Sequence, residues 1–196
     1  EDAPALIHDT AAVADVEFPV GEGGFGEIQE IRGEGVLREE GIAAIGVHPL
    51  HTGIADNGRL VGFECRQLEQ MLALGMVPVI HGDVVMDLSK GACIVSGDQL
   101  VRYLAVALRI SRVGLATDVP GVLDGGVVVP QITRKTVPDL QIGNSSHTDV
   151  TGGMRGKIDE LLGLADAGIR SDIFHVSRTE DFLNGANHGG TIVRGD

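Results

Sequence analysis

Short apolar runs recur along the chain and alternate with segments whose apolar residues repeat at helical spacing. The runs predict six strands: Ala43–Val47, Met76–Ile80, Cys93–Val95, Val113–Thr117, Ile173–Val176 and Thr191–Val193. Each run is apolar at consecutive positions rather than at alternate ones, which suits a sheet that is covered on both faces.

Helical periodicity appears between several of these strands. One helix is predicted to end at Gly75, a second to begin at Ser96, and a third to end near Gly168. The segment Val84–Cys93 has the pattern of a β-hairpin. Strands that alternate with helices predict an α/β fold, a sandwich around a largely parallel sheet.

Composition and charge exclude several classes of function. The 196 residues carry a formal charge of −13, whereas binding to a phosphate backbone needs clustered Lys and Arg, so we expect no nucleic-acid partner. No apolar run approaches the roughly 18 residues of a membrane span, and the acidic start of the chain does not resemble a signal peptide. Two cysteines, Cys65 and Cys93, are too few for a disulfide framework. We therefore expect a cytoplasmic protein without a membrane partner.

The most informative stretch is the glycine-rich segment Asp149–Lys157, which leads into an amphipathic helix. Its small residues, Gly152 and Gly153 among them, would let backbone N–H groups approach an anion, and the start of the helix adds partial positive charge. Lys157 would supply a mobile charge to phosphate oxygens. The alternative is that the glycines only turn the chain and that Lys157 is solvated, in which case its loss would cost little stability.

Three further polar positions lie where predicted strands end. Asp98 follows Ser96 and Gly97 at a strand-to-helix junction, where it would orient a catalytic lysine, help to hold Mg²⁺, or only cap the helix. Asp118 would contact a nucleotide or serve as a turn residue. His81 is a candidate ligand or base, but the histidines show no metal-ligand spacing, so no metal site is predicted.

The order of four segments is more specific than any one of them. His81–Val85, Ser96–Asp98, Thr117–Asp124 and Asp149–Lys157 follow one another in a pattern that resembles the amino-acid-kinase family, and within it the archaeal isopentenyl phosphate kinases. That resemblance implies a three-layer α/β/α sandwich with a mainly parallel central sheet. It also implies a homodimer that binds Mg-ATP and transfers the γ-phosphoryl group to isopentenyl phosphate in isoprenoid biosynthesis.

The same resemblance implies roles for individual residues. The nucleotide would be bound by four positions, which are Asp118, Gly152, Gly153 and Lys157. Lys157 and Asp98 would be catalytic, with Asp98 organising the lysine side chains. The acceptor would be bound by Gly21, Gly26 and Gly97.

The N-terminal region departs from the family pattern. The family opens with a strand carrying Lys-x-Gly-Gly-Ser, which is absent here, and Glu27 stands where the family has a histidine that holds the transferring phosphate. We therefore expect one domain that is incomplete at its N-terminus, with residues 1–45 on the substrate side and 46–196 as the core and nucleotide-binding portion. Two alternatives stay open: another acceptor (an amino acid, UMP, carbamate or a phosphonate), or a nucleotide-binding relative without catalysis.

Overall fold

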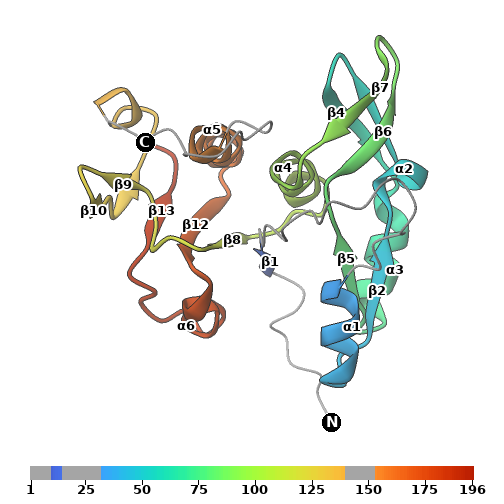
Figure 1. Cartoon of the computed structure of the whole chain (residues 1–196), viewed down its shortest axis with the longest axis horizontal. Coiled ribbons are helices and arrows are strands. Elements are labelled where there is room, and N and C mark those ends of the chain that lie inside the picture. The colour runs from blue at the N-terminus through green and yellow to red at the C-terminus, as the bar shows by residue number, and fades with distance from the viewer. Residues whose placement is uncertain (1–9, 15–31, 140–152) are drawn as a thin grey trace, which may run out of the picture. The chain divides into compact units, whose positions relative to one another are not determined.

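The structure is a computed structural model that describes residues 10–14, 32–139 and 153–196 (Figure 1). Contacts divide the described residues into two compact units. The first comprises residues 32–97. The second comprises residues 10–14, 98–139 and 153–196, so the chain passes from one unit to the other between Gly97 and Asp98.

The second unit is built on a five-stranded sheet with the strand order β1-β8-β12-β13-β11. Strand β8 pairs in parallel with β1 and β12, while β13 runs antiparallel to β12 and parallel to β11. The bounds are β1 Thr10–Ala14, β8 Arg112–Thr117, β11 Gln131–Ile132, β12 Arg170–His175 and β13 Thr191–Val193. A two-stranded ribbon of β9 (Leu123–Asp124) and β10 (Val127–Val128) precedes β11.

Helices cover this sheet on both faces. The main core contains buried side chains from α4 (Gly97–Ala107) and α5 (Gly153–Asp166) together with strand residues such as Leu115 and Ile173. A smaller cluster on α6 (Thr179–Leu183) packs against other strand residues. Two short 3-10 helices, η1 (Val137–Asp139) and η2 (Val176–Arg178), complete the unit.

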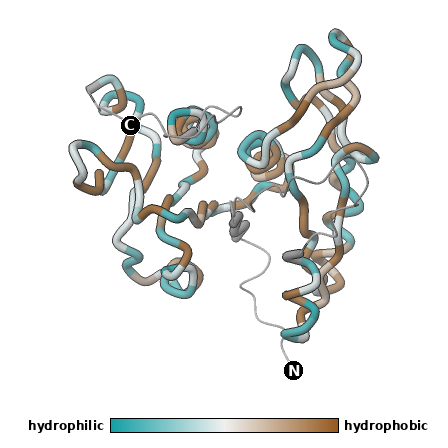
Figure 2. The backbone as a smooth tube through the Cα atoms, in the orientation of Figure 1, coloured by the Kyte–Doolittle hydropathy of each residue, from teal (hydrophilic) through white to brown (hydrophobic). Residues whose placement is uncertain are grey.

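Strand β8 illustrates why its central run, Val113–Ala116, carries no polar side chain. Val113 and Leu115 are fully buried in the main core. The next position in each case faces the other layer: Ala116 packs with Phe174 and Phe182, and a Cβ on Gly114 would lie 2.5 Å from the Phe182 ring. A strand buried on both faces leaves little room for polar side chains (Figure 2 shows the hydropathy along the backbone).

The first unit contains a parallel pair of strands, β2 (Ala44–Val47) and β5 (Val77–Ile80). Three helices belong to the same unit. They are α1 (Arg32–Glu39), α2 (Pro49–Thr52) and α3 (Cys65–Ala73). The pairing places the last residues of β2 and β5, Val47 and Ile80, directly opposite each other.

Two adjoining hairpins form a four-stranded sheet in the order β4-β3-β6-β7. The bounds are β3 Gly53–Asp56, β4 Arg59–Phe63, β6 Asp83–Asp87 and β7 Gly91–Val95. The Asp87 carboxylate joins the two hairpin turns, because it accepts hydrogen bonds from the backbone N–H groups of Asn57, Gly58, Ser89 and Lys90. A buried side chain with this many bonds fixes the tips of the two hairpins relative to each other.

One face of the hairpin sheet is apolar and exposed. Val84 lies opposite Ile94, and Met86 lies opposite Ile54, so the four side chains share a face. Their exposure contrasts with Val85, which points to the other face and is fully buried. Exposed apolar surface of this kind is unusual on a monomer and marks a candidate interaction surface.

The predicted elements are largely confirmed. All six predicted strands are present within three residues of the expected bounds, and the hairpin, the parallel pairing and the three helices are found as well. The hairpin β3–β4 was not predicted, although Asn57-Gly58 at its turn is a strong hairpin signal; both residues have positive φ, 50° and 85°. None of the helices in the described part of the chain has the length and apolarity needed to cross a membrane.

Candidate active site

The N-termini of two helices lie at one edge of the sheet in the second unit. Helix α4 is followed by β8 and helix α5 by β12, each after a short loop, and the two strands are parallel. Because a helix that precedes a strand in this way runs back along it, its first turn lies beside the carboxyl end of that strand. Ligands of open α/β sheets bind at that edge.

Asp98 and Lys157 meet at these two helix starts. Lys157 Nζ donates a hydrogen bond to Asp98 Oδ2 at 3.3 Å, and the two side chains are only 14% and 10% exposed. Asp98 is in the first turn of α4, and Lys157 is four residues into α5. The contact orients the lysine, which favours that role of Asp98 over helix capping alone.

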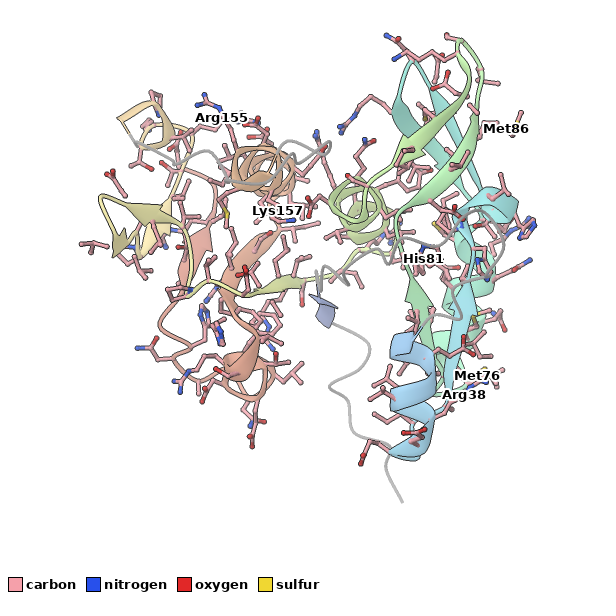
Figure 3. The ribbon with its side chains drawn as sticks, in the orientation of Figure 1. Arg38, Met76, His81, Met86, Arg155 and Lys157 are labelled. Carbon is pink, nitrogen blue, oxygen red and sulfur yellow. The ribbon has the colours of Figure 1, made fainter. Side chains whose placement is uncertain are left out.

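The alternative, in which Lys157 is solvated, is wrong. Lys157 is largely buried against Asp98, whereas Arg155 on the same helix is exposed (Figure 3). Helical periodicity explains the difference, since residues two positions apart point to different sides of a helix. Removing Lys157 would therefore take a compensating charge away from a carboxylate in a partly desolvated position.

A second ion pair links the same two helices further from the edge. Arg102 on α4 forms an ion pair with Glu160 on α5 at 3.0 Å. In this pair the carboxylate is on α5, whereas in the first pair the carboxylate, Asp98, is on α4. The Arg102 side chain also lies against Gly163, where a Cβ would come within 2.3 Å of its guanidinium carbon. The two reversed pairs define the register between α4 and α5.

Asp118 follows the last residue of β8 and is exposed at the same edge. The preceding residue, Thr117, is buried and donates its hydroxyl to the carbonyl oxygens of Val119 and Phe174 at 2.9 and 3.3 Å. These bonds hold the turn after β8, so the Asp118 carboxylate projects from an ordered backbone. Its position is open to a ligand in solvent.

The glycines predicted to line the site fall into two groups. Gly97 opens α4, and a Cβ placed on it would meet nothing within 4 Å, so packing does not require glycine there. Gly153 opens α5. The positions Gly21, Gly26, Glu27 and Gly152 lie outside the described residues.

Three side chains in the first unit come together although their sequence spacing gave no sign of it. His48 follows β2, His81 follows β5, and Asp83 begins β6; one ligand atom from each lies within 4.8 Å of the others. The sequence identified His81 alone as a candidate ligand or base, and nothing around His48 indicated such a role. Only the parallel pairing of β2 with β5 brings the two histidines together.

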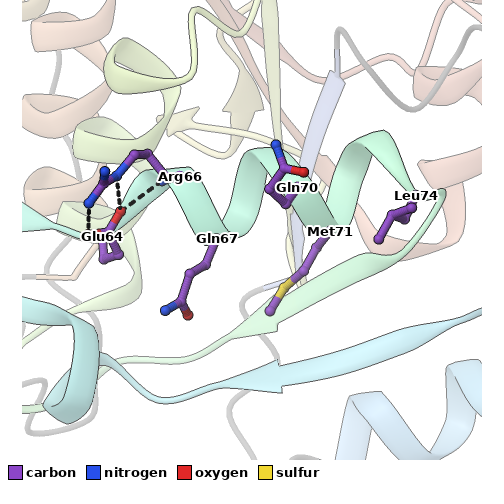
Figure 4. Close-up of a pocket in the computed structure, with 6 residues that line it drawn as sticks. All are labelled: Glu64, Arg66, Gln67, Gln70, Met71 and Leu74. Atoms are coloured by element: carbon purple, nitrogen blue, oxygen red, sulfur yellow. Dashed lines mark hydrogen bonds and ion pairs between the residues drawn. The ribbon is translucent and has the colours of Figure 1, made fainter.

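Two pockets lie elsewhere on the described surface. One of about 530 Å³ runs along α3 and is lined by Glu64, Arg66, Gln67, Gln70, Met71 and Leu74 (Figure 4). Its Glu64–Arg66 ion pair is exposed, and the Arg66 guanidinium lowers the pKa of the Glu64 carboxyl. Neither this pocket nor a smaller one on α4 contains a predicted site residue.

Cys65 and Cys93 are free thiols without the character of nucleophiles. Both are partly buried. Burial, together with neighbouring carboxylates, raises the pKa of each thiol above its ordinary value. A raised pKa disfavours the reactive thiolate, so neither residue is a candidate for covalent catalysis.

Comparison with known proteins identifies several that are similar to this chain. The chain is 44% identical over 161 residues to the isopentenyl phosphate kinase of Haloferax volcanii, covering 82% of this chain and 63% of that one. It is 36% identical to the isopentenyl phosphate kinase of Methanothermobacter thermautotrophicus, covering 81% and 64%. A solved structure of isopentenyl phosphate kinase superimposes with a TM-score of 0.68 at 31% identity, covering 81% and 62%. The chain thus spans a little under two thirds of the length of these relatives.

The mainly parallel sheet, its two flanking helices and the lysine that Asp98 holds near their N-termini define an α/β protein with a candidate anion site at the carboxyl edge of the sheet. The model of the amino acid kinase family matches residues 32–175. The chain belongs to the amino acid kinase family, and it has that family's fold.

Proposed function

We propose that this chain carries the core of a kinase that transfers the γ-phosphoryl group of ATP to isopentenyl phosphate, giving isopentenyl diphosphate for isoprenoid biosynthesis. The observation that carries the proposal is the largely buried Asp98–Lys157 pair at the carboxyl edge of the sheet. It occurs in a chain 44% identical to a protein named isopentenyl phosphate kinase.

Lys157 would act on the phosphates of ATP. In phosphoryl transfer an oxygen of the acceptor attacks the γ-phosphorus, the bond to the leaving ADP oxygen breaks, and charge spreads over the phosphoryl oxygens. A lysine held by Asp98 would meet that charge without losing much side-chain freedom at the moment of reaction. Asp98 is therefore assigned the role of positioning Lys157.

The nucleotide and its metal would bind at the same edge. Asp118 offers an exposed carboxylate beside the turn after β8, and the first turn of α5 at Gly153 presents backbone N–H groups. Mg²⁺ would arrive with the ATP phosphates and neutralise part of their charge. We extend the nucleotide-binding role to Gly152, which adjoins Gly153 in the sequence.

The acceptor phosphate would approach the backbone at Gly97. The open space at that position supports the assignment, because a residue without a Cβ lets an anion come close to the N–H groups that begin α4. Gly21 and Gly26 are proposed to bind the acceptor as well, from the resemblance alone.

The test is an ADP-release assay with Mg-ATP on the chain as it stands, with isopentenyl phosphate, UMP, carbamate, a phosphonate and an amino acid as separate acceptors. Turnover that is highest with isopentenyl phosphate and absent in the double variant Asp98→Leu/Lys157→Met would support the proposal. Faster turnover with another acceptor would show that isopentenyl phosphate is not the preferred substrate and would identify that acceptor in its place. ATP binding without turnover on any acceptor would instead identify a non-catalytic relative.

We also propose that the protein acts as a homodimer in the cytoplasm. The exposed apolar face of Ile54, Val84, Met86 and Ile94 supports an interface, since a second copy would remove it from water. Two free cysteines suit a reducing compartment. Light scattering should give twice the chain mass, and Met86→Glu should lower it to one chain; a dimer unaffected by this change would assign the interface to another surface.

A further inference from the structure

The corner formed by His48, His81 and Asp83 brings together three side chains of the kind that bind transition metals. Strands β2 and β5 are parallel with Val47 opposite Ile80, so the residues that follow them, His48 and His81, emerge side by side. Their ring centroids are 5.6 Å apart at an interplanar angle of 86°. Asp83 is two residues beyond His81, and all three side chains are partly buried.

The hydrogen bonds at this corner orient two of the three groups. His81 Nδ1 lies 2.8 Å from the carbonyl oxygen of Gly82. A carbonyl oxygen only accepts, so Nδ1 carries the proton and Nε2 keeps its lone pair. Asp83 Oδ1 accepts a hydrogen bond from the backbone N–H of Val84 at 2.7 Å. Metal-ligating histidines usually donate the N–H of their second ring nitrogen to a backbone carbonyl, a carboxylate or water, and His81 has the first of these partners.

We propose that His48, His81 and Asp83 bind one divalent transition-metal ion, Zn²⁺ or Co²⁺ rather than Mg²⁺. Two imidazoles and one carboxylate form a mixed nitrogen and oxygen donor set, which selects such ions over Mg²⁺ and Ca²⁺. Ligand atoms about 2.1 Å from a tetrahedral metal lie roughly 3.4 Å from one another. The ligand atoms of the three side chains already lie within 4.8 Å of one another, so small side-chain rotations bring them to that spacing.

Two alternatives could explain why these three side chains lie together: packing of the two rings, or a bound anion. A bound cation explains the cluster better than either. The edge-to-face contact of the two rings could be packing, but packing does not account for a carboxylate beside them. A phosphate held by the two histidines would meet the negative charge of Asp83, which repels it. A cation satisfies all three groups together.

The site lies next to a residue that the proposed function uses. A Cβ on Gly82 would come within 3.0 Å of the Val95 carbonyl oxygen and 3.1 Å of the Gly97 nitrogen, so the backbone of this corner packs tightly against Gly97. Three protein ligands leave one coordination position open to water or to another ligand. The metal site itself does not depend on the kinase proposal, because it is tested by binding alone.

The experiment is a titration of the tag-free chain with Co²⁺, followed by its visible absorption, and then displacement by Zn²⁺. We expect one ion per chain, the strong visible bands of a four-coordinate site, displacement by equimolar Zn²⁺, and no displacement by millimolar Mg²⁺. His48→Asn, His81→Asn and Asp83→Asn should each weaken binding at least tenfold, since even residues that only support a ligand change affinity roughly ten- to a hundredfold.

Two histidine variants serve as controls for general imidazole binding. His51 is exposed, with its ring 6.2 Å from that of His48, and His175 belongs to the second unit. His51→Asn and His175→Asn should leave the Co²⁺ spectrum and stoichiometry unchanged. Circular dichroism and the melting temperature of each metal-free variant will show whether its fold is intact; a variant that does not fold is replaced by the Gln substitution at the same position.

The proposal fails if the chain binds no Co²⁺ above the level of the His48→Asn/His81→Asn double variant. It fails equally if binding is unchanged in all three ligand variants, or if His51→Asn abolishes the spectrum as completely as His81→Asn does.

Discussion

Replacing Lys157 by methionine removes the positive charge of a largely buried ion pair and keeps most of the side-chain volume. Lys157 Nζ is 3.3 Å from Asp98 Oδ2, and the Asp98 side chain is 10% exposed. We expect Lys157→Met to abolish phosphoryl transfer and also to lower stability, because the carboxylate of Asp98 loses this ion pair without regaining water.

The magnitude follows from the geometry. At 3.3 Å and an effective dielectric constant of about 20, the attraction is about 5 kcal/mol, and desolvation of the two charges offsets most of it. Removing one partner forfeits the attraction while the desolvation of the other remains, so the expected loss is about 3 kcal/mol. For a chain of this size that corresponds to a fall of roughly 6–12 °C in melting temperature.

The double variant Asp98→Leu/Lys157→Met separates stability from function. With both charges gone, no desolvated charge of this pair is left uncompensated, and we expect at least half of the lost stability to return. Activity should not return, because the positive charge of Lys157 is no longer available to meet the phosphates. Thermal unfolding and ADP release are measured on the wild type, both single variants and the double variant.

Two results would refute this reasoning. A shift of less than about 2 °C for Lys157→Met would mean that the pair is effectively solvated. Wild-type turnover in the double variant would mean that the pair only joins two helices and takes no part in catalysis.

Three further predictions concern other positions. Gly97→Ala should fold normally, since its Cβ meets open space, but should raise KM for the acceptor; an unchanged KM would remove Gly97 from the site. Gly114→Ala should lower stability by about 1–3 kcal/mol in chemical denaturation, because its Cβ would lie 2.5 Å from the Phe182 ring, and adding Phe182→Leu should recover part of the loss. At Asp87, burial would raise the pKa, but the backbone N–H groups of its hairpin turns outweigh it and lower the pKa to about 2. Its ionised form therefore stabilises the fold above about pH 4 and loses that effect as the pH falls through about 2. Asp87→Asn should be less stable than wild type near pH 6, and the difference in stability should narrow in acid. A difference that does not change with pH would contradict this prediction.

The local elements and the family could both be predicted from the amino-acid sequence. Continuous apolar runs identified strands such as β8 because a strand covered on both faces leaves little room for polar residues in its central part. The glycine-rich segment before α5 and the Ser96–Asp98 junction before α4 were visible for a similar reason, since helix starts depend on residues within a few positions of one another. The Asn57-Gly58 turn carries an equally local signal, so the hairpin β3–β4 was predictable in the same way.

Which side chains meet depends on the tertiary structure. Asp98 and Lys157 are 59 positions apart, and Arg102 and Glu160 are 58 apart, so no local pattern could pair them or show that Lys157 is buried. His48 lies beside His81 because β2 and β5 pair in parallel, which the sequence does not show. Propensity and periodicity act within one element, whereas burial and ion pairing depend on how elements pack against one another. For this reason candidate residues could be identified from the sequence, but which of them lie in contact was decided by the tertiary structure.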